Sequence, residues 1–95
     1  MINNELKIII VLYNSSDLIF KCLEKLVNFK IIVVDNGKND LLIKKIKFFS
    51  NIEKIITKNK NIGFGNAINF AFKDIDTSFF LILNLVEVYE GGKFF

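Results

Sequence analysis

Apolar residues follow two spacings along this chain, and the spacing changes from segment to segment. Continuous apolar runs predict strands at residues 6–13, 30–34 and 78–83 that are buried on both faces, and a short further strand is predicted at residues 54–57. Apolar residues at helical intervals predict amphipathic helices between these runs, at residues 18–27, 41–49 and 66–72. This alternation predicts an α/β fold with an open, mostly parallel, Rossmann-like sheet flanked by helices.

Each predicted strand is followed by polar or small residues. In open α/β sheets the carboxyl ends of the strands share one rim, where ligands bind, so we expect these segments to form one site. Asp35 follows four β-branched apolar residues directly and is the first candidate. The alternative is that Asp35 only caps the next turn or helix, and the sequence leaves both interpretations open. The other strand ends are Asn14, the loop at residues 58–65, and Asn84.

Composition limits the kind of protein. The 95 residues predict a single small domain, residues 1–95. All 13 basic residues are lysine, and without the planar fork of arginine we expect no nucleic-acid binding. The apolar runs are far shorter than the roughly 18 residues of a membrane span. No signal-peptide pattern begins the chain, so we expect a cytoplasmic protein without a membrane span.

The residue types also limit the chemistry. With one cysteine and no histidine, a zinc site is not expected, and a metal would be held by oxygen, as Mg or Mn is. Cys22 lies on the apolar face of its helix and is interpreted as a core thiol. The residues after the first strand, NSSD, lack the glycine pattern of a dinucleotide fold, and neither glycine-bearing loop forms a phosphate-binding P-loop.

Four motifs follow one another along nearly the whole chain: IVLYN at residues 10–14, VVDNG at 33–37 with Asp40, NIGFGNAIN at 61–69, and LILN at 81–84. In this order and spacing they resemble the N-terminal half of glycosyltransferase family 2, especially rhamnosyltransferase-like enzymes of bacterial surface polysaccharide synthesis. The resemblance implies the nucleotide-binding half of a GT-A fold with strand order 3-2-1-4. It also implies a pyrimidine nucleotide sugar, UDP- or dTDP-linked, as the partner.

The resemblance assigns nucleotide-binding roles to particular residues. Tyr13 and Asn14 would border the base. Asp35 would accept the imide N–H of uracil or thymine, because an ionised carboxylate only accepts and an imide N–H donates. The remaining implied site residues are Asn36 beside Asp35, the glycine loop Asn61, Gly63, Phe64 and Gly65, and Asn84.

The chain departs from the family where a metal would bind. After Asn84 the family carries an acid that holds a divalent metal at the leaving diphosphate. Here Val86 occupies that position and cannot be a ligand, while Glu87, one residue on, would face the opposite way and is a weak candidate. We therefore expect no tightly bound cofactor, and we assign a catalytic role to no residue of this chain. The diphosphate would meet only flexible lysines, Lys38, Lys58 or Lys60, so we expect weak nucleotide binding.

Two functional interpretations remain open. The first is a truncated glycosyltransferase, without the acceptor half that carries the catalytic base, which is inactive alone and needs another chain. The second is a non-enzymatic remnant or interaction module that keeps the fold. Exposed apolar residues recruit partners, so the tail predicts a homo-oligomer through Val86, Val88, Tyr89, Phe94 and Phe95.

Overall fold

The computed structural model describes residues 3–13, 18–37, 40–58 and 60–86. Within them, strands and helices alternate along the chain as β1 (Asn3–Tyr13), α1 (Leu18–Lys25), β2 (Phe29–Asp35), α2 (Asp40–Ile46), β3 (Ile52–Thr57), α3 (Phe64–Phe72) and β4 (Phe79–Val86). The strands form one sheet in the order β3-β2-β1-β4, and all neighbouring pairs are parallel. The predicted α/β class and the implied strand order are confirmed.

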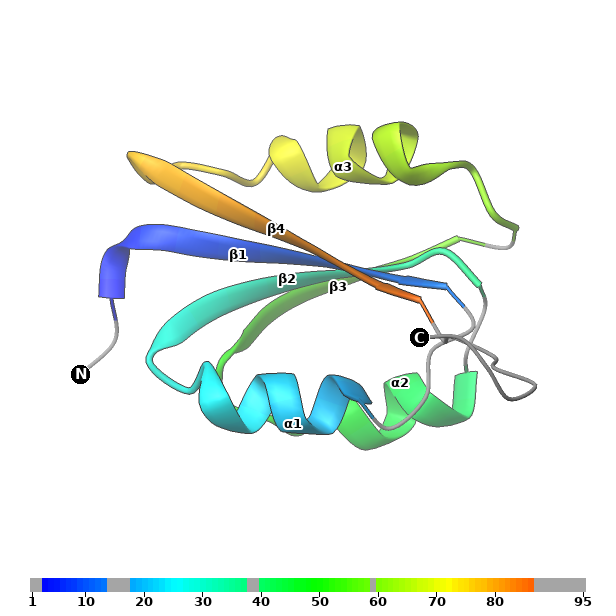
Figure 1. Cartoon of the computed structure of the whole chain (residues 1–95), viewed down its shortest axis with the longest axis horizontal. Coiled ribbons are helices and arrows are strands. Elements are labelled where there is room, and N and C mark those ends of the chain that lie inside the picture. Colours follow the sequence, from blue (N-terminus) through cyan, green and yellow to red (C-terminus); the bar gives the residue numbers. More distant parts are fainter. Residues whose placement is uncertain (1–2, 14–17, 38–39, 59, 87–95) are drawn as a thin grey trace, which may run out of the picture.

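The central strands β1 and β2 are buried on both faces, as their continuous apolar runs predict. The edge strand β3 is only partly buried, and Phe79, Phe80 and Leu81 of β4 are exposed, so the predicted burial of β4 on both faces is wrong. Helices α1 and α2 lie on one face and α3 lies on the other (Figure 1). Because successive side chains of a strand point to opposite faces, β1 directs Ile8, Ile10 and Leu12 to the core under α1 and α2. It directs Ile9 and Val11 to the core under α3. One strand thus contributes to two separate apolar cores.

The helices bury the apolar faces that their spacing predicts. Burying one large aliphatic side chain contributes roughly 1.5–3 kcal/mol, so the buried isoleucines and leucine of α1 and α2 hold these two helices to the sheet. Cys22 is a half-buried free thiol packed against the core of α1 and α2. No helix in the described part of the chain is long and apolar enough to cross a membrane. The fully buried helical residues are Ile19 and Leu23 in α1, Ile46 in α2, and Ala67 and Ala71 in α3.

Helix α1 ends earlier than its apolar spacing predicts, at Lys25, and Val27 is exposed. The buried side chain of Asn51 meets this end of the helix. Its Nδ2 donates to the backbone carbonyls of Leu23 and Leu26, both at 3.1 Å. The last turn of a helix leaves such carbonyls without a partner, so Asn51 caps α1. Apolar periodicity does not reveal this contact.

Other boundaries also differ from the predicted ones. Helix α2 ends at Ile46 and does not reach residue 49. Strand β4 does not stop at Asn84, because Asn84 pairs with Val11 and the backbone pairing with β1 continues through Val86. Asn84 is therefore a strand residue near the carboxyl edge of the sheet, not the first residue after the strand. The tail residues expected to recruit partners, from Val88 on, lie outside the described residues.

A cluster of charges lies near the amino edge of the sheet. Lys7 Nζ is 2.8 Å from Glu53 Oε2 and 2.8 Å from Asp76 Oδ1, and it donates to the carbonyl of Asp74 at 3.2 Å. Burial lowers the pKa of Lys7, but the hydrogen bonds and charges of Asp76 and Glu53 outweigh burial and raise it overall. The hydrogen bond from Lys7 lowers the pKa of Asp76. This cluster ties β3 and the segment before β4 to β1.

Candidate functional site

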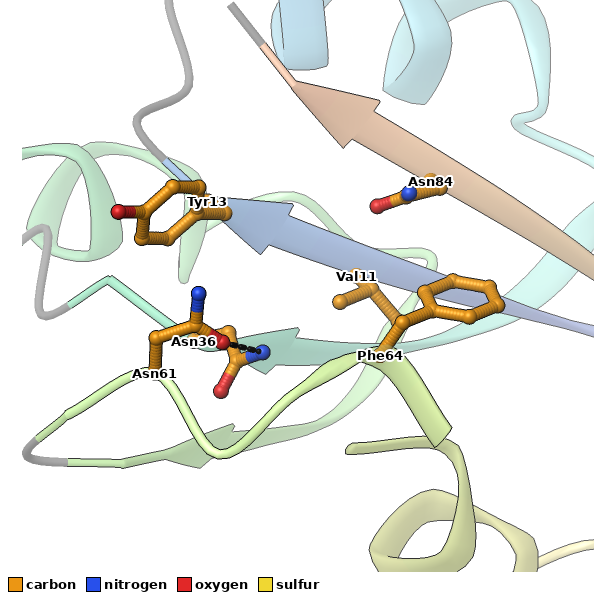
Figure 2. Close-up of a pocket in the computed structure, with 6 residues that line it drawn as sticks. All are labelled: Val11, Tyr13, Asn36, Asn61, Phe64 and Asn84. Carbon is orange, nitrogen blue, oxygen red and sulfur yellow. Dashed lines mark hydrogen bonds between the residues drawn. The ribbon is translucent and has the colours of Figure 1, made fainter. Parts of the chain in front are cut away.

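A cleft lies at the carboxyl edge of the sheet, where the sequence predicts a site. It has a volume of about 180 Å³. Its lining comes from the end of β1, the residue after β2, the loop into α3, the first residue of α3, and β4. The side chains around it are those of Val11, Tyr13, Asn36, Asn61, Phe64 and Asn84 (Figure 2).

A second hollow, of about 150 Å³, lies at the opposite edge of the sheet. Its lining includes Lys30 and Ile52, which stand near the starts of β2 and β3. Ligands of open α/β sheets bind beyond the carboxyl ends of the strands. The cleft of Figure 2 is therefore the candidate site.

The cleft brings together residues that the sequence predicts from four separate segments. The predicted site residues that line it are Tyr13, Asn36, Asn61, Phe64 and Asn84. The predicted residues Asp35, Gly63 and Gly65 adjoin these along the chain but do not line the cleft. Asn14 lies outside the described residues. Val11 lines the cleft and was not predicted, although its position two residues before Tyr13 places both on the same side of β1.

Asp35, the first candidate from the sequence, ends β2 and is fully buried, with 0% of its surface exposed. Its Oδ1 accepts a hydrogen bond from the backbone N–H of Gly37 at 3.1 Å, a contact typical of an Asx turn. Its backbone carbonyl accepts from the N–H of Lys58 at 2.9 Å, which joins the ends of β2 and β3. The turn-capping contact of the alternative interpretation is therefore present. A contact between Asp35 and a base stays a prediction.

Asn36 connects three segments at the carboxyl edge. Its backbone N–H donates to the carbonyl of Leu12 at 2.8 Å, which holds it against the end of β1. Its Oδ1 accepts from the N–H of Ile62 at 3.0 Å. Its Nδ2 donates to Asn61 Oδ1 at 2.9 Å (Figure 2). The same Nδ2 donates to the carbonyl of Gly63 at 3.3 Å. With only 2% of its surface exposed, Asn36 holds the loop before α3 against the sheet.

The two glycines of this loop have different roles. Gly63 has φ 88° and ψ 156°, a backbone conformation that residues other than glycine rarely adopt. It precedes the first residue of α3, and its carbonyl accepts the N–H of Ala67 at 3.1 Å. Gly65 lies inside α3, and a Cβ at either glycine would meet no atom within 4 Å. Glycine is therefore required at Gly63 by conformation and not by crowding within the chain.

The lining of the cleft is uncharged among the residues that the structure describes. It offers asparagine amides, two aromatic rings and one valine. Mg and Mn prefer carboxylate ligands, which this lining does not contain, so the described residues do not fit the metal that the resemblance implies. Val86 ends β4 opposite Tyr13, and Glu87 lies outside the described residues.

One of the lysines expected to meet a diphosphate is engaged elsewhere. Lys58 Nζ lies 3.3 Å from the centre of the Phe70 ring, a cation–π contact with an exposed ring of α3. Lys60 is exposed beside the loop, and Lys38 is outside the described residues. The charge that would face a diphosphate is therefore not assembled within the cleft lining described above.

Comparison with known proteins adds an independent observation. Residues 7–85 match the sequence model described as Glycosyl transferase family 2. A protein named teichoic acid poly(glycerol phosphate) polymerase, from Staphylococcus epidermidis, is 30% identical over 90 residues, which represent 85% of this chain and 12% of the polymerase. The chain thus spans a small part of the length of that relative. No solved structure matches the chain. Neither comparison names a rhamnosyltransferase, so that subtype stays a prediction.

Proposed function

Because this chain belongs to glycosyl transferase family 2, we propose that its cleft binds the pyrimidine nucleotide of a UDP- or dTDP-sugar. One observation carries this proposal. Side chains from β1, β4 and the segments after β2 and β3 form a single cleft at the carboxyl edge of the sheet. All of them lie within the residues that match the family.

The chemistry of the lining suits a nucleobase. Asparagine amides can both donate and accept hydrogen bonds, as the edge of a base requires. The rings of Tyr13 and Phe64 add flat apolar surface that a base can stack on. Pockets for drug-sized ligands measure roughly 300–1,000 Å³. At about 180 Å³ the cleft has room for only part of a nucleotide sugar, so we expect weak binding centred on the nucleoside.

Asp35 enters the proposal as the acceptor for the imide N–H of the base. Its carboxylate has no exposed surface and is engaged with the N–H of Gly37. Because Asp35 has no exposed surface, a direct contact with the base requires the atoms that cover the carboxylate to move when the nucleotide binds. This requirement makes Asp35 the residue whose substitution separates the two interpretations most sharply.

We further propose that the chain does not transfer a sugar by itself. The motivation is Val86, which stands where the family resemblance places a metal-binding acid. Losing such electrostatic stabilisation of a leaving group typically costs about a hundredfold or more in rate. Incubating the chain with UDP- and dTDP-sugars and Mg or Mn should give no hydrolysis above a control without protein. Metal-stimulated hydrolysis that disappears in Glu87→Gln would contradict this expectation.

A second function, as a non-catalytic interaction module, is favoured by a different observation. In the described part of the sheet β4 is an edge strand, and its Phe79, Phe80 and Leu81 are exposed. Exposed edges and apolar side chains recruit partner chains. This function does not need the cleft, so the two candidates can be tested separately.

An NMR titration tests nucleotide binding at the level of single residues. On adding UDP, the side-chain amide signals of Asn36, Asn61 and Asn84 should shift, because these groups line the cleft. The signal of Asn51 serves as the internal control, since Asn51 lies at the second hollow and caps α1. Equal shifts with ADP, or no shifts with UDP at millimolar concentration, would contradict the proposal.

A further inference from the structure

Two backbone N–H groups determine how the amides of Asn36 and Asn61 are oriented. A backbone N–H can only donate, so the side-chain atom that it meets must be an oxygen. The N–H of Ile62 meets the side chain of Asn36 at 3.0 Å, and the N–H of Gly63 meets the side chain of Asn61 at 2.8 Å. Both oxygens are therefore assigned by chemistry, and the nitrogens take the remaining positions.

This assignment leaves both donors of the Asn36 side chain occupied. Its oxygen accepts from Ile62, and its Nδ2 donates to Asn61 Oδ1 and to the carbonyl of Gly63. With 2% of its surface exposed, it has little to offer a ligand directly. Its main contribution is to hold the oxygen of Asn61 within the loop.

Asn61 is occupied on one side only. Its Oδ1 accepts two hydrogen bonds, from Asn36 Nδ2 and from the N–H of Gly63. Its Nδ2 makes no hydrogen bond to any residue that the structure describes, and Figure 2 shows it directed towards Tyr13 across the cleft. Rotating the amide would break both bonds to Oδ1. The cleft is thus lined by a donor that cannot easily exchange with an acceptor.

We propose that Asn61 Nδ2 donates to the carbonyl oxygen at position 4 of uracil or thymine, and that Asn36 is the positioning residue that aims it. The proposal rests on the proposed function, in which a pyrimidine base occupies the cleft. Cytosine has an amino group at position 4, so a donor would meet a donor, and the hydrogen bond from Asn61 would be lost. The cleft should therefore prefer UDP over CDP by roughly tenfold or more.

Asn61→Asp is the sharpest variant. A carboxylate at this position still accepts from Asn36 and from Gly63, so the loop keeps its bonds, but the donor to the ligand becomes an acceptor. The ratio of UDP to CDP affinity should fall to about one or below, while the melting temperature changes little. Repulsion between the new charge and the diphosphate is the same for both nucleotides and cancels in the ratio. Asn69→Asp adds the same charge at an exposed position of α3 and should leave the ratio unchanged.

Asn36→Ala tests the positioning role. Removing its amide leaves Asn61 Oδ1 held by the N–H of Gly63 alone, so the amide of Asn61 is aimed less firmly and the UDP to CDP ratio should fall towards one. If Asn36 acts through Asn61, the double variant with Asn61→Asp should show the ratio of Asn61→Asp alone, because effects within one network do not add. A merely structural role would lower stability and weaken both nucleotides equally. Should Asn36→Ala not fold, Asn61→Asp alone still decides the specificity.

The outcomes separate this inference from the proposed function. Calorimetric or NMR titration that finds UDP binding with the same UDP to CDP ratio in the wild type and in Asn61→Asp overturns the role of Asn61 and leaves nucleotide binding intact. Additive effects of Asn36→Ala and Asn61→Asp on the ratio overturn the positioning role. A wild-type chain that binds neither nucleotide overturns this inference together with the proposed function.

Discussion

Asp35 offers a test in which stability and affinity should change separately. We consider Asp35→Ala and Asp35→Asn. The structure shows a fully buried carboxylate whose Oδ1 accepts from the N–H of Gly37 at 3.1 Å. A hydrogen bond to a charged group contributes roughly 1.5–3 kcal/mol. Alanine removes this bond, so Asp35→Ala should lower the free energy of unfolding by about that amount, or about 4–8 °C in melting temperature for each kcal/mol.

The asparagine variant keeps part of both contacts. Its Oδ1 can still accept from the N–H of Gly37 and from the imide of a base, although without the charge. Asp35→Asn should therefore lose less stability than Asp35→Ala. If Asp35 contacts the base, Asp35→Ala should also weaken UDP binding by about ten- to a hundredfold, and Asp35→Asn by less.

Thermal unfolding and nucleotide titration of the same protein samples provide the assay. Domains of this size are stable by roughly 5–15 kcal/mol, so both variants should remain folded and measurable. The reasoning is refuted if both variants lose stability in the expected order but bind UDP as tightly as the wild type. Asp35 would then be a turn cap alone.

Three further predictions concern other parts of the chain. Gly63→Ala should destabilise the domain by about 1–3 kcal/mol because of the positive φ at this position. Gly65→Ala, inside α3, should stabilise the domain by up to about 1 kcal/mol. Equal melting temperatures of the two variants would contradict this prediction. Lys7→Met should lower the melting temperature most near neutral pH. The contribution of Asp76 is full above its ordinary pKa of 3.8 and is lost as the pH falls through its lowered folded value. The contribution of Lys7 to stability is full below its ordinary pKa of 10.5 and is lost as the pH rises through its raised folded value. A difference in melting temperature between wild type and Lys7→Met that does not depend on pH would be evidence against the cluster. Finally, Phe79→Lys and Leu81→Lys, at positions that are 67% and 45% exposed on the edge strand β4, should reduce self-association measured by light scattering at tens of micromolar; a wild-type chain that is monomeric under these conditions would refute the predicted oligomer.

The arrangement of strands could be predicted because its physical signature is local. A strand buried on both faces must be apolar at every position, and residues 8–12 and 31–34 satisfy this without interruption. The polar residues that follow such strands then share one rim. This explains why Tyr13, Asn36 and Asn61, from separate segments, were expected at one site and lie around one cleft.

The contacts that give the site its chemistry could not be read from the sequence. Asn36 and Asn61 are 25 residues apart, and nothing in either segment shows that their amides bond each other. Asn51 likewise caps the last turn of α1 from 28 residues away. The capping of the turn at Gly37 by Asp35 was one of two open alternatives. Side-chain hydrogen bonds across long separations depend on the finished packing and not on local pattern.

The central claim is that the cleft binds pyrimidine nucleotides, and calorimetric titration of the wild-type chain with UDP, dTDP and ADP tests it most directly. The account predicts weak but measurable binding of UDP and dTDP, with ADP weaker by roughly tenfold or more, because the cleft has room for only part of a nucleotide and its amides would meet the edge of a small base. Equal affinity for ADP and UDP, or no binding of any of the three, would contradict it.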